Sequence, residues 1–269
     1  MRDTIKSKEY FNSYIIETAS LIKDNDMFLR DGNINQERIK WNRKGSFDYS
    51  YSILIAKYSA GESFDIIKES YCRTLETMLL AWHESVTKVN SKDHSSKIIF
   101  WNQYMVSPYS QMLQMLSLGF LLDIGKDKLQ SLVDIIDRDS ISDNLYEFII
   151  KACFSDRVQK RAEEYDTEQS VILKVYDKLR KAIETTDKIE ASKLLKQFLE
   201  KDFYHKHADF YGLHNKKYNA YYGYWSFEAA AVVKIMGLND STFIDNQYYP
   251  KDLVHQPKEP PKKLVFTRS

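Results

Sequence analysis

The residues best suited to chemistry in this sequence are three histidines and an aspartate that lie close together. They are His205, His207, Asp209 and His214. Imidazole and carboxylate groups are zinc ligands, so this cluster could serve a metal-dependent hydrolase. In a helix, however, residues two apart point roughly 200° away from each other, so His205 and His207 could share an ion only on an extended backbone. We therefore expect no metal site and keep the hydrolase as the alternative function.

Other catalytic signatures do not occur in the sequence. There is no GxSxG nucleophile elbow, no phosphate-binding glycine loop and no HExxH zinc motif. Cys72 and Cys153 lie far apart without metal-ligand spacing, which favours buried thiols in a reducing compartment. We predict a protein that is not an enzyme and needs no cofactor.

The N-terminus and the most apolar stretch bear on location. The first residues, MRDTIKSKEYF, lack the apolar core of a signal peptide, and residues 112–124 are too few to span a bilayer. The net charge is +1, so no global field draws nucleic acid or an anionic membrane to the protein. We expect a cytoplasmic protein without a membrane partner.

Acidic residues are concentrated between residues 123 and 147. The acids are Asp123, Asp127, Asp134, Asp137, Asp139, Asp143 and Glu147, against Lys126, Lys128 and Arg138. One interpretation is helix capping, since Asp139 and Asp143 stand where a helix should restart. The other is an acidic surface for a basic partner, with Asp134, Asp137, Asp139 and Asp143 as candidate binding residues. Reversing the charge at Asp137 and Asp139 would then weaken binding without unfolding the protein.

Two basic segments could contact nucleic acid. Lys216 and Lys217 stand beside tyrosines that could stack on bases, and residues 257–269 carry several lysines and three prolines. The basic runs are short, however, and acidic residues are interspersed throughout the chain. We interpret 257–269 as a basic surface tail and expect no direct contact with nucleic acid.

Apolar side chains recur at helical spacing along most of the chain. The clearest stripe is Phe64, Ile67, Tyr71, Leu75, Met78 and Trp82. Gly61 and Ser63, just before it, predict a left-handed helix end and an N-cap. Pro108 predicts the start of a further, central helix, because proline at the first helical position gives up only an amide that would be unpaired.

Further amphipathic segments follow in succession. Their stripes are Leu129, Leu132, Val133 and Ile136, then Leu145, Phe148, Ile149 and Ala152, then Ile172, Val175, Leu179 and Ile183. Asp187 and Glu190 resemble a capping box that opens one more helix. No Val/Ile/Thr-rich alternation separates these segments, so no β-domain is indicated. The predicted fold class is all-α, a multi-helix array of amphipathic helices in two closely packed helical subdomains.

The most distinctive stretch lies near the C-terminus. It runs Tyr221-Tyr222-Gly223-Tyr224-Trp225-Ser226-Phe227-Glu228-Ala229-Ala230-Ala231 and is followed by Tyr248-Tyr249-Pro250-Lys251-Asp252-Leu253. Ser226 can cap a helix that Gly237 ends. Glu228 stands in the first turn of that helix, where the helix dipole favours a carboxylate. These residues could form a buried polar cluster that holds the C-terminal helix.

This stretch and its Tyr-Tyr-Pro-x-Asp-Leu ending resemble the C-terminal domain of the PoNi family, the immunity proteins that neutralise PoNe-type DNase toxins of bacterial polymorphic toxin systems. Upstream, Arg2-Asp3 with Tyr10-Phe11, residues 58–62 and residues 117–122 resemble the family's N-terminal domain. The resemblance implies an N-terminal helical domain at 1–125, a C-terminal helical domain at 126–256, and the tail 257–269 outside both.

The resemblance also implies a function, that of an inhibitor which binds a secreted nuclease toxin and keeps its active site from the DNA of the producing cell. An acidic surface around Asp134 to Asp143 would suit that role. The signature residues are Tyr221, Tyr222, Gly223, Tyr224, Trp225, Ser226, Glu228, Tyr249, Pro250 and Asp252, and they could mark either the fold or the interface. We favour the fold, because Trp225 beside a helix cap is typical of a packing anchor. The identity of the toxin and the oligomeric state stay open.

Overall fold

The computed structural model describes residues 1–30, 35–83, 86–92, 98–158, 171–207 and 210–255. Its elements are α1 (Lys8–Arg30), α2 (Gln36–Ala60), α3 (Phe64–Ala81), β1 (Val86–Lys92), β2 (Ile98–Tyr104), α4 (Val106–Leu122), α5 (Lys126–Arg138), α6 (Asn144–Cys153), α7 (Val171–Glu184), α8 (Lys188–Gln197), the π-helix η1 (Phe198–Phe203), the 3-10 helix η2 (Leu213–Asn215), α9 (Phe227–Met236) and α10 (Lys251–Val254). This closely packed helical array confirms the predicted all-α class.

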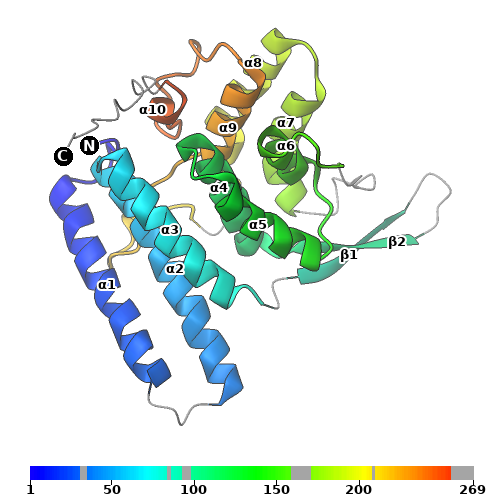
Figure 1. The fold of residues 1–269 in the computed structure, drawn as a ribbon. Helices are drawn as coiled ribbons and strands as arrows, with labels where there is room; N and C mark the ends of the chain where they lie inside the picture. Colours follow the sequence, from blue (N-terminus) through cyan, green and yellow to red (C-terminus); the bar gives the residue numbers. More distant parts are fainter. Residues whose placement is uncertain (31–34, 84–85, 93–97, 159–170, 208–209, 256–269) are drawn as a thin grey trace, which may run out of the picture.

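The helices are arranged around α4. The long helices α1, α2 and α3 lie side by side on one side of the molecule, and α6 to α9 form the other side (Figure 1). Between them, α4 packs against α9 and α6 as well as α3 and α5, and its side chains are almost all buried. The apolar sequence of this helix therefore predicted its central position. Neither α4 nor any other described helix is long and apolar enough to cross a membrane.

The corner between α2 and α3 has the geometry that its sequence predicts. Gly61 adopts a left-handed conformation with φ +84°, and its amide bonds back to carbonyl oxygens of the last turn of α2. A Cβ atom at this position would lie 2.7 Å from the backbone nitrogen of Met1, so a side chain would also collide with the N-terminus. Ser63 caps α3 by accepting a hydrogen bond from the Ile66 amide.

The other predicted helix ends are present in the structure, and one helix start lies at a different residue than predicted. Asp187 caps α8, Ser226 caps α9, and Gly237 ends α9 in the left-handed conformation. The start of α4 is different, because the helix begins at Val106 and Pro108 lies inside its first turn. Proline is tolerated there for the expected reason, since amides in the first turn have no partner within the helix.

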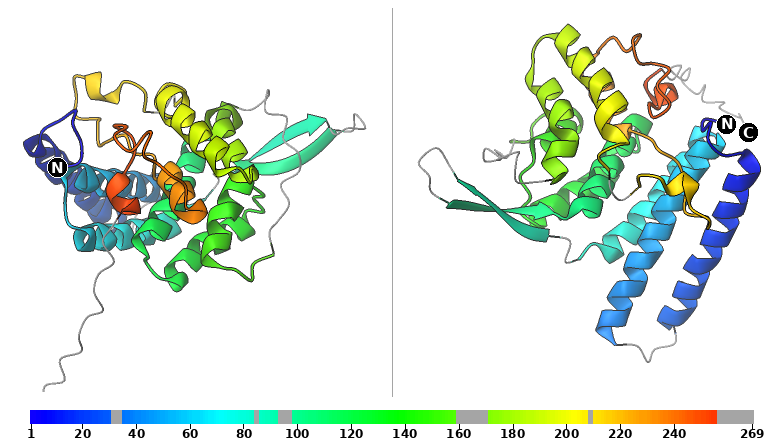
Figure 2. Two further views of the ribbon diagram at one scale, coloured as in Figure 1. Left: turned by 90° about the horizontal axis from the view of Figure 1, so that it is seen from above. Right: turned by 180° about the vertical axis from the view of Figure 1, so that it is seen from behind.

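The hairpin of β1 and β2 is an element that the sequence did not predict, although two strands make no β-domain and agree with the all-α class. The strands pair antiparallel with Val86 opposite Tyr104, and the hairpin projects away from the helices (Figure 2). Its strands contain several polar residues, and the pairing of backbones does not require an alternation of apolar residues along the strand. The base of the hairpin is anchored by the buried ring of Tyr104, whose centroid lies 5.2 Å from that of Trp82.

Candidate functional site

Asp143, one of the four candidate binding aspartates, lies inside the protein. Its exposed fraction is 2%. Oδ1 accepts hydrogen bonds from the amides of Leu145 and Tyr146, so Asp143 is the N-cap of α6. Oδ2 lies 2.6 Å from Nη2 of Arg180 on α7. The capping interpretation of the sequence is confirmed at this residue, and Asp143 is not part of an exposed acidic surface.

Asp137 is also engaged with an arginine. The Arg157 guanidinium forms two hydrogen bonds with Asp137, of 2.8 and 3.1 Å, and Nη2 also lies 2.7 Å from Oε1 of the buried Glu147. Hydrogen bonds to these two carboxylates raise the pKa of Arg157 above its usual range, so the guanidinium stays charged. Arg157 therefore neutralises much of the charge that Asp137 and Glu147 bring to this region.

Asp139 and Asp134 complete the acidic segment. Asp139 accepts hydrogen bonds from the Tyr104 hydroxyl at 2.9 Å and from Nε of Arg138 at 2.8 Å, and its side chain is largely enclosed. Asp134 on α5 is exposed and accepts a hydrogen bond of 2.8 Å from Nε2 of the Gln130 side chain. The structure thus distributes the four aspartates between the interior and the surface, and Asp134 is the most accessible of them.

The three histidines of the sequence cluster lie in different surroundings. His207 is buried, with its ring stacked 4.3 Å from that of Phe210, whereas His205 is exposed. Nδ1 of His214 lies 3.0 Å from the Tyr224 hydroxyl. Asp209 lies outside the described residues, and among those that are described no group of three His, Cys, Asp or Glu side chains is placed to hold a metal ion. The metal-dependent hydrolase is therefore not favoured.

The distinctive C-terminal stretch is built against the end of α2. Nε1 of Trp225 donates to the Ser59 hydroxyl at 2.8 Å, and that hydroxyl bonds to the Tyr222 carbonyl oxygen at 2.9 Å. The rings of Trp225 and Tyr58 meet edge to face with centroids 5.0 Å apart. Gly223 has φ +126°, and a Cβ there would lie 2.1 Å from the Ser59 hydroxyl oxygen. Only glycine fits this close approach between the two segments.

The first residues of the chain join the same network. Arg2 forms an ion pair with Asp252, and Asp252 also accepts a hydrogen bond from the Tyr58 hydroxyl. Asp3 is buried and accepts a hydrogen bond of 2.5 Å from the Tyr221 hydroxyl. The backbone amides of Arg2 and Asp3 both bond to the Ser59 carbonyl oxygen. The N-terminus, the corner after α2 and the C-terminal stretch are thus held together by buried and half-buried polar contacts.

Glu228 is a fully buried carboxyl group in the first turn of α9. Oε1 accepts a hydrogen bond from the Ser226 hydroxyl at 2.9 Å, and within the described part of the chain Oε2 has no hydrogen-bond partner. Burial raises the pKa of Glu228 to about 7, against the lowering effect of its hydrogen bonds. The carboxyl group is therefore substantially protonated in the folded protein near neutral pH.

This burial predicts a stability that falls with rising pH. The pKa is 4.5 in the unfolded reference and about 7 in the folded protein, so between these values the folded state binds more protons. The contribution of Glu228 is complete below pH 4.5 and is lost as the pH rises to about 7. We expect Glu228→Gln to remove this slope and to raise the free energy of unfolding near pH 8 by about 2 kcal/mol.

Denaturant unfolding across this pH range would measure the effect as the difference between variant and wild type. Glu190→Gln is the matched control, because Glu190 is a partly exposed carboxylate in the first turn of α8. The control should keep the wild-type slope. An identical slope in Glu228→Gln would show that Glu228 is already ionised in the folded protein.

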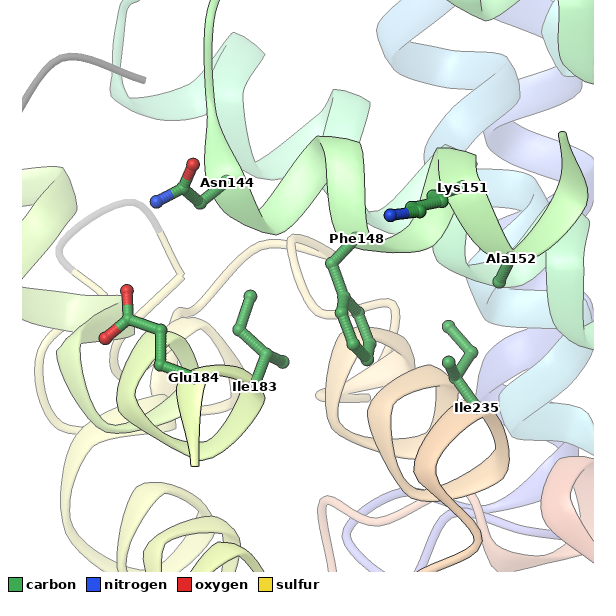
Figure 3. Close-up of a pocket in the computed structure, with 7 residues that line it drawn as sticks. All are labelled: Asn144, Phe148, Lys151, Ala152, Ile183, Glu184 and Ile235. Carbon is green, nitrogen blue, oxygen red and sulfur yellow. The ribbon is translucent and has the colours of Figure 1, made fainter. Parts of the chain in front are cut away.

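Three concavities remain as candidate binding sites on the described surface. One of about 450 Å³ lies between α6, α7 and α9, where Phe148, Ile183 and Ile235 converge with Lys151 and Glu184 near its edge (Figure 3). A second, of about 300 Å³, borders the N-terminal network. The third, of about 640 Å³, lies where α2, the end of α3 and the start of α4 meet. None of the four candidate aspartates lines any of these three concavities.

Comparison with protein families assigns both halves of the chain. Residues 2–134 match the family model described as PoNe immunity protein (PoNi), N-terminal, and residues 141–253 match PoNe immunity proteins (PoNi), C-terminal. The chain belongs to the PoNe immunity protein family. Membership indicates an immunity protein whose partner is a PoNe nuclease toxin. The matched ranges include both ends of the Arg2–Asp252 network.

A solved structure supports the fold of this PoNe immunity protein. The crystal structure of protein PA2201 from Pseudomonas aeruginosa is similar with a TM-score of 0.60 and 17% sequence identity, over 94% of this chain and 89% of that chain. At this identity the likeness concerns the fold alone. No match is found among curated proteins.

The residues of the PoNe immunity signature are visible in the sequence, but the contacts that connect them are not. The pairs Arg2–Asp252 and Asp3–Tyr221 join opposite ends of the chain, and no local pattern marks them. The third concavity was missed as well, although Trp41 in a basic helical segment was a visible signal. The division of the chain at residue 125 stays a prediction.

Proposed function

We propose that this PoNe immunity protein inhibits a cognate nuclease toxin by binding it as a rigid surface, without catalysing any reaction. The proposal rests on the match of both family domains over most of the chain. The network that joins the N-terminus, the α2–α3 corner and the C-terminal stretch supports it, because a surface held rigid before binding loses little entropy on binding.

Within this function, the acidic end of α5 is proposed to attract the toxin. We use this name for Asp134, Asp137 and the C-cap residue Asp139. A protein that binds DNA carries positive charge on its DNA-binding face, and complementary charge speeds association. Asp134 is the best-exposed member, and Asp137 retains partial exposure beside Arg157. Charge reversal at Asp137 or Asp139 would also break their pairs with Arg157 and Arg138, so the earlier expectation of unchanged folding does not suit these two positions.

Binding to a PoNe nuclease toxin tests the proposed function. The purified chain should bind that nuclease tightly, with an interface of roughly 1,600 Å² in total, and abolish DNA cleavage. Co-expression should rescue cells from the toxin, and an unrelated nuclease serves as control. The proposal fails if the chain neither binds nor protects, or if the chain alone turns over a substrate.

Asp134→Lys tests the attraction. We expect association with the toxin to slow by about tenfold at low ionic strength, and the difference to shrink as salt is added. Asp26→Lys, an exposed aspartate on α1, is the matched control and should associate like wild type. Equal association rates for both variants, measured by stopped-flow fluorescence, would remove the acidic end of α5 from the interface.

A further inference from the structure

The largest of the three concavities has an unusual lining. It lies at the N-terminal half of α2, at the end of α3 and at the start of α4, next to the base of the hairpin (Figure 1). Its lining residues are Gln36, Glu37, Lys40, Trp41, Lys44, Ala81, His83, Met105 and Pro108. We refer to these residues as the Trp41 groove.

Trp41 is exposed to solvent, whereas many other aromatic side chains of the protein are buried in the core. Its exposed fraction is 71%, and that of Met105, which also lines the groove, is 48%. The other tryptophan near the groove, Trp82, is buried against Phe47 and Tyr104. Packing of the core therefore does not require Trp41. Tryptophan is among the residue types that are enriched where a few side chains dominate binding between proteins.

Two lysines and one acid line the groove. These lysines are Lys40 and Lys44, and the acid is Glu37. Lys44 forms an ion pair with Asp48, and Lys40 is exposed. Arg38 and Arg43 are exposed on the same helix but do not line the groove. A partner that fills this groove should therefore present a carboxylate beside an apolar side chain.

We propose that the Trp41 groove receives an acidic segment of the nuclease toxin that carries an apolar side chain. This inference rests on the proposed function. Nucleases that work through metal ions hold those ions with carboxylates, so their DNA-facing side combines acidic and basic groups. The two lysines that line the groove complement the acidic groups, and the acidic end of α5 complements the basic ones.

The two surfaces are connected in the structure. Nη2 of Arg138, at the end of α5, donates to the Trp82 carbonyl oxygen at 2.9 Å, and the next residue, His83, lines the groove. A toxin of ordinary size could therefore contact both surfaces within one interface. The apolar wall formed by Ala81, Met105 and Pro108 favours a protein occupant over a nucleic-acid backbone, which would need basic groups along its whole path.

Two variants and two matched controls test the groove. The probe is the purified PoNe nuclease toxin used to test the proposed function, and its Kd with the full chain is measured by calorimetry. Trp41→Ala and Lys40→Glu should each weaken binding by at least about tenfold. Tyr218→Ala removes an equally exposed aromatic ring elsewhere, and Lys201→Glu reverses an exposed charge on η1, so both should stay within about twofold of wild type. All four variants should unfold at the wild-type temperature.

Each other outcome overturns the inference. If wild type binds the toxin and Trp41→Ala binds equally well, the groove is not used while the proposed function stands. If wild type does not bind the toxin at all, the proposed function and the groove fall together. If the chain binds single-stranded DNA and Trp41→Ala abolishes that binding alone, the occupant is nucleic acid. If the chain forms a dimer in sedimentation and Trp41→Ala abolishes the dimer alone, the occupant is a second copy of the chain.

Discussion

Arg180→Met is expected to lower the free energy of unfolding by about 3 to 5 kcal/mol, because it leaves the buried carboxylate of Asp143 without its cation. Nη2 of Arg180 lies 2.6 Å from Asp143 Oδ2 and 2.6 Å from the Tyr109 hydroxyl oxygen, and both charged side chains are buried. Methionine keeps much of the volume of the arginine stem but supplies no charge. Denaturant unfolding followed by circular dichroism measures the loss.

Two further variants interpret that measurement. Lys181→Met, one residue along α7, removes an exposed lysine paired with Asp177 and should change stability by less than about 0.5 kcal/mol. Adding Asp143→Asn to Arg180→Met should recover part of the loss, because the uncompensated charge is then gone. If Arg180→Met were as stable as Lys181→Met, Asp143 would not depend on Arg180 in the folded protein.

Trp225→Ala is expected to cost about 3 to 5 kcal/mol of stability. The exposed fraction of Trp225 is 6%, its ring packs edge to face on Tyr58, and Nε1 donates to Ser59. The substitution removes this packing and leaves the Ser59 hydroxyl without a donor from the C-terminal stretch. Thermal and denaturant unfolding should both show the loss. The stability of Trp225→Phe should lie between those of Trp225→Ala and wild type.

Trp41→Ala is the matched control for Trp225→Ala, since it truncates the same residue type at the surface. Its stability should lie within about 0.5 kcal/mol of wild type. The pair of variants also separates the fold from the interface. A Trp225→Ala protein that folds normally and no longer protects cells would show that the signature stretch is a binding surface, contrary to the packing role that we propose.

The acidic segment shows what a sequence cannot reveal about charge. It contains carboxylates that read as one patch, but Asp143 pairs with a residue 37 positions away and Asp137 with one 20 positions away. The strength of a surface field depends on such partners, and they are brought together only when the chain folds. The capping role of Asp143, by contrast, depends on the next three residues and was predictable.

The surroundings of the histidines and the presence of the hairpin could not be predicted from the sequence, for related reasons. His207 and His214 are close in sequence, but their rings enter different aromatic surroundings, because His207 packs against Tyr176 of α7 and His214 against Tyr224. In the hairpin, the apolar anchor Tyr104 stands at the end of a strand, so alternation within the strand is weak. Contact with Trp82 on another element holds that anchor in place.

By itself, the sequence determined the all-α class, the ends of most helices and the family. Caps, left-handed glycines and a period of about 3.6 residues act over a few neighbouring positions, so they can be read without the fold. Only the tertiary structure decided which carboxylates meet an arginine, how Arg2 reaches Asp252, and that Trp41 stays exposed beside a groove. Those features depend on side chains that are distant in the chain, and their free energy is set by burial and by the partners found there.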